Sequence, residues 1–254
     1  MAEKDFLEKR IRELDQQCYD RDIIRYTDFL DIREQSVYLS MQRELSSDSL
    51  LYGGHEEADR QMAMFLPSYM DRDYPELAAE SCMALLLARP LNERFSDDLT
   101  HRDFLGALMN LGIERSKTGD ILTDGTKAYI FTTSDMAGFI CDELRRVRHT
   151  SIYCEKVPLS ACDIRPKFEE LRVNVASERA DAVIAAVYKL SRETASALIE
   201  AGNVFMDGRE LRKASVELRE GCRLSVRGHG KLRYEGTENV TRKGRLYVNI
   251  KRYV

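Results

Sequence analysis

The stretch ERADAVIAAVYKLSRETASALIEAGNVFMDGREL, residues 178–211, decides the fold expected for the C-terminal part of the chain. It predicts a first helix over 179–188. The apolar residues that recur there at i, i+4 and i+7 are Val183, Val187 and Leu190. A second helix follows, because Ser191 is a favoured N-cap residue and Gly202 suits the left-handed conformation that ends many helices.

Short strands are predicted around this helical pair. Asp207-Gly208 is a signal for a type I′ turn, so residues 204–206 and 209–211 are expected to form a hairpin. A further strand is expected over 223–226. The alternation of apolar and polar residues at 173–175 predicts another strand that enters the same sheet.

Charge is unevenly distributed along the 254 residues. The net charge of −4, averaged over the chain, argues against a nucleic-acid partner. Residues 209–254, however, contain thirteen Lys and Arg against five Glu, a net of +8, so the rest of the chain carries −12. This segregation favours an RNA-binding function for the C-terminal part.

The start of the second helix is a candidate anion site. Free N–H groups at a helix N-terminus attract anions, and the cations Arg179, Lys189 and Arg192 lie near Ser191 in the sequence. A capped and solvated helix start is the alternative that these residues leave open.

The order of elements in this stretch adds a resemblance. It is carried by Arg179-Ala-Asp181, Ser191-Arg192, Ala195, Ile199, Gly202-Asn-Val204, Asp207-Gly208 and Gly221-Cys-Arg-Leu224. These residues resemble the S4 RNA-binding module of ribosomal protein S4, tyrosyl-tRNA synthetases and pseudouridine synthases. The resemblance implies an RNA-binding site made of Arg179, Lys189, Ser191, Arg192, Arg212 and Lys213 and extended by Arg227 and Lys231.

The remaining sequence predicts an α+β protein with two further parts. Residues 1–75 read as an N-terminal helical and β region, with a helical apolar stripe, two strands flanking a Gly-Gly and acidic loop, and a linker over 68–75. The residues of the first stripe are Phe6, Leu7, Ile11 and Leu14. The S4 module is expected over 176–254 and ends in a C-terminal strand.

Between these parts, residues 79–160 alternate in type. Strands are expected over 81–89, 120–123, 127–132 and 151–157, and helices over 100–111 and 135–147. The order β-α-β-β-α-β is that of a ferredoxin-like α/β plait, which RNA-recognition domains also use. A base-stacking platform would need exposed aromatic residues on the central strands. Tyr129 and Phe131 are candidates, but core packing of Phe131 is the favoured interpretation.

Several classes of protein are excluded or disfavoured. His101-Arg102-Asp103 lacks the Asn of a kinase catalytic loop, since residue 108 is Leu, and no glycine-rich phosphate loop accompanies it. The six cysteines and four histidines are scattered, so we expect buried reduced thiols and neither a metal site nor a cofactor. No apolar run is long enough to span a bilayer, and we expect a cytoplasmic protein with no membrane partner.

A closer resemblance follows from four blocks. They are YGGHEEA (52–58), FSDDLTHRDFLGALMNLGIER (95–115) with GDI (119–121), SVRGHGK (225–231) and TRKGR (241–245). The blocks resemble YlmH-type S4 proteins, a bacterial family. The resemblance implies a cytoplasmic, monomeric and non-catalytic factor that binds ribosomal RNA and tRNA on the large ribosomal subunit carrying a stalled peptidyl-tRNA. There it would assist ribosome-associated quality control, in which the nascent chain receives a C-terminal tail.

An RNA-modifying enzyme is the alternative function. S4 modules are often joined to pseudouridine synthases or methyltransferases, which would use the module as an RNA anchor. A methyltransferase would need a glycine-rich loop after a strand, which the sequence lacks. A pseudouridine synthase needs a catalytic Asp in a larger β-rich domain than residues 79–158 can form. An RNA-binding factor without catalysis is therefore preferred.

Overall fold

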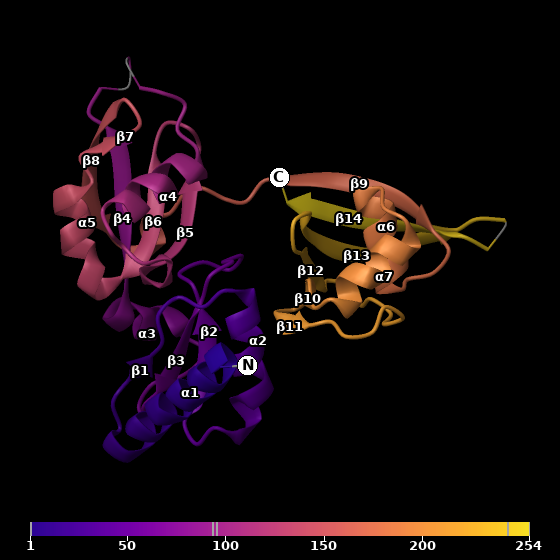
Figure 1. Ribbon diagram of the computed structural model, residues 1–254, viewed down its shortest axis with the longest axis horizontal. Helices are drawn as coiled ribbons and strands as arrows, with labels where there is room; N and C mark the ends of the chain where they lie inside the picture. Colours follow the sequence, from indigo (N-terminus) through magenta and orange to yellow (C-terminus); the bar gives the residue numbers. More distant parts are fainter. Residues whose placement is uncertain (1, 93, 95, 243, 254) are drawn as a thin grey trace. The chain divides into compact units, whose positions relative to one another are not determined.

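The protein is an α+β chain with several antiparallel sheets, seen here in a computed structural model (Figure 1). The structure describes residues 2–92, 94, 96–242 and 244–253. Two compact units make up the chain, residues 1–165 and 166–254. Phe95 and Lys243, which belong to two of the blocks quoted above, lie outside the described residues.

The N-terminal region contains two helices and an antiparallel sheet of order β1-β3-β2. Its elements are α1 (Ala2–Arg21), β1 (Arg25–Tyr26), α2 (Ile32–Met41), β2 (Asp48–Tyr52) and β3 (Met62–Leu66). Ile11 and Leu14 of α1 are buried against Phe65 of β3, as the apolar stripe predicts. Phe6 is the exception: its side chain is 74% exposed, because it lies in the first turns of α1, outside this cluster.

The central part of the first unit has helices α4 and α5 on one face of a five-stranded sheet (Figure 1). Along the chain the elements are α3 (Pro75–Cys82), β4 (Met83–Pro90), α4 (His101–Asn110), β5 (Thr118–Thr123), β6 (Ala128–Thr133), α5 (Ala137–Glu143), β7 (Arg146–Val147) and β8 (Thr150–Val157). The antiparallel strands lie in the order β5-β6-β4-β8-β7. From β4 to β8 the types of element, with the short β7 set aside, follow one another as β-α-β-β-α-β.

Two elements of this part differ from the expectation. The helix predicted over 135–147 ends at Glu143, because Arg146 and Val147 leave it to pair with Ser151 and Thr150 of β8. The predicted linker runs into an unpredicted helix, α3, which begins with Pro75 at its first turn.

The second face of the five-stranded sheet packs against the N-terminal region. Met62 and Met64 of β3 share a hydrophobic cluster with Met83 of β4 and Phe131 of β6. The loop before β3 approaches so closely that a Cβ atom on Gly54 would lie 2.4 Å from the Phe131 ring. The parts expected at 1–75 and 79–160 are thus joined by a continuous core.

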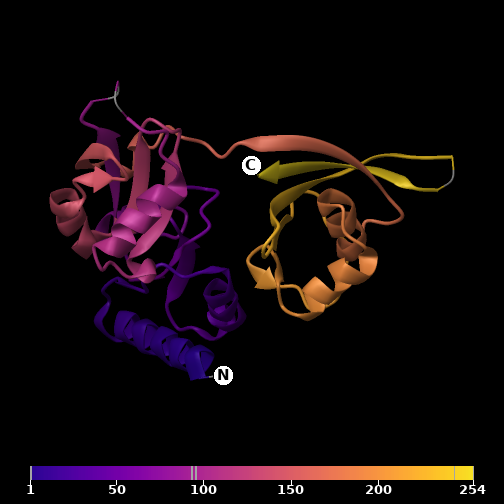
Figure 2. The ribbon, with the colours of Figure 1, turned by 45° about the horizontal axis from the view of Figure 1, so that its top comes forward.

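The second unit has a six-stranded antiparallel sheet of order β11-β10-β12-β13-β14-β9. Its elements are β9 (Phe168–Val175), α6 (Ala180–Tyr188), α7 (Arg192–Glu200), β10 (Val204–Met206), β11 (Arg209–Glu210), β12 (Arg223–Val226), β13 (Gly230–Val240) and β14 (Leu246–Tyr253). Helices α6 and α7 pack their apolar residues on one face, and β13 and β14 extend as a hairpin beyond them (Figure 2).

Local predictions for this unit are confirmed at several positions. Ser191 accepts from the backbone N–H of Thr194 at 2.9 Å as the N-cap of α7. Asp207 and Gly208 have φ values of 49° and 77°, the positive values that a type I′ turn requires. Residues 173–175 belong to β9, which pairs with β14 at the edge of the sheet.

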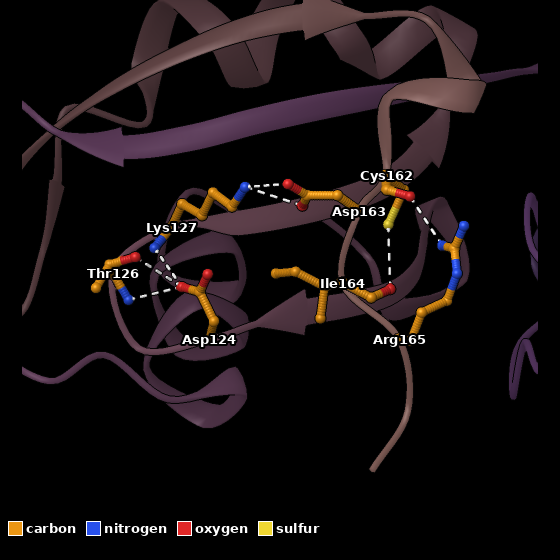
Figure 3. A network of polar contacts seen from close by, with 7 residues as sticks. All are labelled: Asp124, Thr126, Lys127, Cys162, Asp163, Ile164 and Arg165. Atoms are coloured by element: carbon orange, nitrogen blue, oxygen red, sulfur yellow. Dashed lines mark hydrogen bonds and ion pairs between the residues drawn. The ribbon is translucent and has the colours of Figure 1, made fainter.

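Polar contacts fix the segment that ends the first unit (Figure 3). The Nζ atom of Lys127, in the β5–β6 turn, lies 2.7 and 2.8 Å from the carboxylate oxygens of Asp163. Asp124 accepts from the backbone N–H groups of Thr126 and Lys127 in the same turn. Arg165 donates to the carbonyl of Cys162 at 2.8 Å. The turn and residues 162–165 therefore form one ordered patch.

Candidate nucleic-acid interface

A buried carboxylate holds two of the predicted RNA-binding arginines. Asp181, in the first turn of α6, has a side chain only 4% exposed. It accepts from Nε and Nη2 of Arg179 at 3.1 and 3.0 Å and from Nη2 of Arg192 at 2.7 Å. The N-cap of α6 and the first residue of α7 are thereby joined through one side chain.

The protonation of Asp181 follows from these contacts. Burial acts to raise its pKa, but the hydrogen bonds from Arg192 and Arg179 outweigh that effect and hold the pKa below its ordinary value. The carboxylate is therefore ionised at neutral pH. Both side chains remain partly exposed, at 39% for Arg179 and 51% for Arg192, which leaves room for their guanidinium groups to donate to a phosphate as well.

Two further predicted residues, Lys189 and Ser191, lie between α6 and α7. Lys189 ends α6 in the left-handed conformation, with φ of 55°, and its side chain is exposed. The hydroxyl of Ser191 is used within the protein, because it caps α7 and lies 2.8 Å from the hydroxyl of Thr194. Ser191 therefore shapes the surface as a capping residue.

The loop after β11 brings Arg212 and Lys213 to the same side. The backbone N–H groups of Ala180 and Asp181 donate to the carbonyls of Val216 and Ala214 in this loop. The loop thus runs beside the start of α6. Arg212 is 78% exposed, with 3.8 Å between its Nε and Oε1 of Glu210, and Lys213 is also exposed, so both bring cations to the loop beside the start of α6.

The turn between β12 and β13 contributes Arg227. Its backbone N–H donates to the carbonyl of Asn203 at 2.9 Å, and the ring of His229 lies 5.5 Å from that of Tyr188 at the end of α6. Burial raises the pKa of Tyr188 to about 12, so its hydroxyl stays protonated. Arg227 is exposed on this turn, which lies near the end of α6 and so near Lys189.

Lys231 is not gathered with the others. Leu232 packs in the core beneath α6 and α7, and neighbouring residues of a strand point to opposite faces. Lys231 therefore lies on the face of the sheet away from the helices, where its Nζ is 5.3 Å from the centre of the Tyr253 ring. The predicted RNA-binding residues therefore do not all share one face of the sheet, because Lys231 lies on the face away from α6 and α7.

Other candidates from the sequence have structural roles. Phe131 is fully buried, which confirms the core interpretation, and Tyr129 is 4% exposed, so neither side chain offers a stacking platform. Asp103 accepts from the backbone N–H and the hydroxyl of Thr100, which caps the start of α4 and lowers the pKa of Asp103. All six cysteines are free thiols, five of them buried.

The described part of the chain contains neither a membrane-spanning helix nor a metal-binding cluster. It holds no helix with the length and apolar character needed to cross a membrane. In the same part, no group of three or more His, Cys, Asp or Glu side chains is placed to hold a metal ion.

The sequence did not assign a role to Asp181, although it lies in the block that resembles the S4 module. Its two partners are separated from it by two and eleven residues. Arg179 precedes α6 and Arg192 lies on α7, so neither is on the same helix as Asp181 and only the fold shows the contact. The signal available in the sequence was an acidic residue between basic ones at the start of a helix.

Three comparisons show what this chain is similar to. Residues 86–161 match the family model described as the putative RNA-binding domain in YlmH. Over 233 residues, covering 90% of this chain and 87% of the relative, the sequence is 29% identical to the ribosome-associated protein quality control protein P2 of Bacillus subtilis (strain 168). A solved structure, the cell division protein ylmH from Streptococcus pneumoniae, matches 65% of this chain and 96% of its own, with a TM-score of 0.49 and 20% identity. The resemblance to YlmH-type proteins that the sequence predicts is confirmed, and within it residues 86–161 are similar to the RNA-binding domain described for that family.

Proposed function

We propose that this chain is a non-catalytic RNA-binding factor that contacts ribosomal RNA and tRNA on the large ribosomal subunit. Residues 166–254 serve as an S4-type module and the part from β4 to β8 as a ferredoxin-like plait. The protein acts in the cytoplasm as a monomer and assists the C-terminal tailing of stalled nascent chains. The likeness to the Bacillus subtilis quality control protein supports this role.

The contact of Asp181 with Arg179 and Arg192 is the observation that carries the RNA-binding part of the proposal. A guanidinium fixed by a buried carboxylate loses less side-chain freedom when it binds a phosphate than a freely moving one does. RNA helices are recognised mainly through phosphates and 2′-hydroxyls, so a fixed cluster of cations suffices without groups that read bases. Arg212, Lys213 and Lys189 add exposed positive charge to that cluster.

Co-sedimentation with purified large ribosomal subunits tests the proposal. The double variant Arg212→Gln/Lys213→Gln removes two exposed charges without touching the carboxylate of Asp181. We expect about tenfold weaker binding, because two cations that pair with phosphates are removed. The matched control is Arg21→Gln/Arg43→Gln, which removes two exposed arginines of the N-terminal region and should bind like the parent.

Two results would count against the proposal. Equal binding of both double variants would show that the helical side of the second unit is not the anchor. Uridine isomerisation or methyl transfer on ribosomal RNA, measured with the purified protein, would favour the alternative of an RNA-modifying enzyme.

A further inference from the structure

Both broad faces of the five-stranded sheet in the first unit are covered. Helices α4 and α5 pack on one face, through Phe104 and Ile140 among others. The N-terminal region covers the other face, where Tyr129 and Phe131 are buried. Base stacking on the sheet, as in RNA-recognition motifs, is therefore not open to this domain. The surfaces left for RNA on residues 86–161 are the edges of the sheet and the outer faces of the helices.

One such edge is hollow and basic. A groove of about 590 Å³ lies between α4 and the segment that connects α5 to β8. Its lining contains four arginines, Arg102, Arg145, Arg146 and Arg148, and the side chains of all four are exposed. Among the described residues only Arg148 of these four has an ion pair, with 3.8 Å between its Nε and Oδ1 of Asp103.

The backbone that carries three of these arginines is fixed. Val147 is fully buried in the core under α4 and α5, and it anchors the short strand β7. Arg146 pairs with Ser151 of β8, and the carbonyl of Arg145 accepts from the backbone N–H of Ile152 at 2.9 Å. Arg146 alternates with Val147 along β7 and so points away from the core, and Arg148 follows in the turn with φ of 53°. The backbone on this side of the groove is therefore held in place by the fold.

The charges of the lining favour an anion. Besides the four arginines it contains two acidic residues, Asp103 and Glu143, so its net charge is +2. The carboxylate of Asp103 is already used by Thr100 at the start of α4. This positive groove lies within the first unit, residues 1–165, which carries a net −10, so it is a local exception in an acidic unit.

The side chains of the lining also indicate whether the groove contacts the phosphates or the bases of a nucleic acid. Among the described residues it has four guanidinium groups and no aromatic side chain on which a base could stack. Guanidinium groups bind phosphates with two parallel hydrogen bonds. We propose that this groove binds the phosphate backbone of double-stranded RNA, as a second RNA contact independent of sequence and separate from the interface around Asp181.

Fluorescence anisotropy with the full chain and a labelled RNA duplex of about 16 base pairs tests this site. The variant Arg145→Gln/Arg146→Gln should bind the duplex about tenfold more weakly than the parent. The slope of log affinity against log salt should fall in magnitude by about two, one unit for each phosphate that the variant no longer neutralises. The matched control, Arg21→Gln/Arg43→Gln, should leave both quantities within twofold of the parent.

A substitution on α4, which forms the opposite wall of the groove, tests the same site without changing a residue of β7. Arg102→Gln, on the exposed side of α4, should weaken duplex binding and lower the slope by about one. Unchanged affinity and slope in the Arg102 and Arg145/Arg146 variants, with folding verified by circular dichroism, would overturn the inference. The Arg212→Gln/Lys213→Gln variant separates the two proposals: if it binds more weakly while the groove variants do not, only the groove is rejected.

Discussion

At the scale of single residues, Asp181 shows what sequence analysis can and cannot reach. The resemblance to the S4 module gave Arg179 and Arg192 as RNA contacts, and both lie on one surface. Arg192 is 51% exposed but is not a free charge, because its Nη2 lies 2.7 Å from the buried carboxylate of Asp181. Arg192→Glu would therefore affect the fold as well as RNA binding. Only the packing of α6 against α7 shows this contact.

Replacement of Asp181 by Asn should lower stability in a pH-dependent manner. The folded pKa of Asp181 is depressed, so its contribution is fully present above the unfolded value of about 3.9 and is lost as the pH falls towards the folded value. At pH 7 we expect the free energy of unfolding to fall by about 1–2 kcal/mol, a modest figure because both arginines are partly exposed. Calorimetric unfolding at pH 7 and below pH 4 should show a smaller difference from the parent in acid; an equal difference would contradict this account.

RNA affinity of the same variant separates positioning from net charge. Asp181→Asn removes a negative charge, so electrostatics alone would strengthen RNA binding. We expect weaker binding instead, because the two arginines lose the group that orients them. Glu193→Gln, an exposed acid in the first turn of α7, is the control and should bind RNA no more weakly than the parent.

At the scale of elements, the sequence predicted whether a segment is a helix or a strand better than it predicted the residues at which the segment begins and ends. The helices and strands of the central part follow the expected alternation, since each has its own apolar period. The end of α5 was placed too late because Leu144 and Val147 continue an apolar pattern, although Val147 is buried from the strand β7. The core shared by β3 and β6 was also not predictable, because it joins residues far apart in the sequence.

Gly54 tests how tightly these elements are joined. It has φ of 91°, and a Cβ atom would lie 2.4 Å from the Phe131 ring. Gly112 has a similar φ of 80° but nothing within 4 Å of such an atom. Both replacements by Ala carry the backbone cost of about 1–2 kcal/mol, and Gly54→Ala adds about 1–3 kcal/mol of overpacking. Chemical denaturation followed by circular dichroism should show the larger destabilisation for Gly54→Ala, and equal values would show that the Phe131 ring yields freely.

At the scale of the whole molecule, charge separates between the two units. Residues 166–254 contain eighteen Lys and Arg against twelve Asp and Glu, a net of +6, so residues 1–165 carry −10. The charge count from the sequence, +8 for residues 209–254 and −12 for the rest, has the same signs as this contrast. Deleting residues 1–75 is a poor test of it, because β3 shares its core with β4 and β6 and the remainder would expose that core.

The fragment 166–254 provides a sharper test of what the acidic unit does. Its hydrophobic cluster is formed entirely by its own residues, from Leu171 to Ile250, so we expect it to fold alone. Freed from a unit with net charge −10, it should bind an arbitrary RNA duplex more tightly than the full chain at low salt. The gain should shrink as salt rises, since screening acts over about 10 Å at 0.1 M ionic strength. Preference for the large ribosomal subunit over that duplex should fall in the fragment, because the groove of the first unit and the repulsion of misplaced RNA are both absent. Anisotropy and co-sedimentation on the fragment and the full chain measure the two affinities. If the folded fragment binds arbitrary RNA no more tightly than the full chain at any salt concentration, the acidic unit does not repel RNA and acts only as a scaffold.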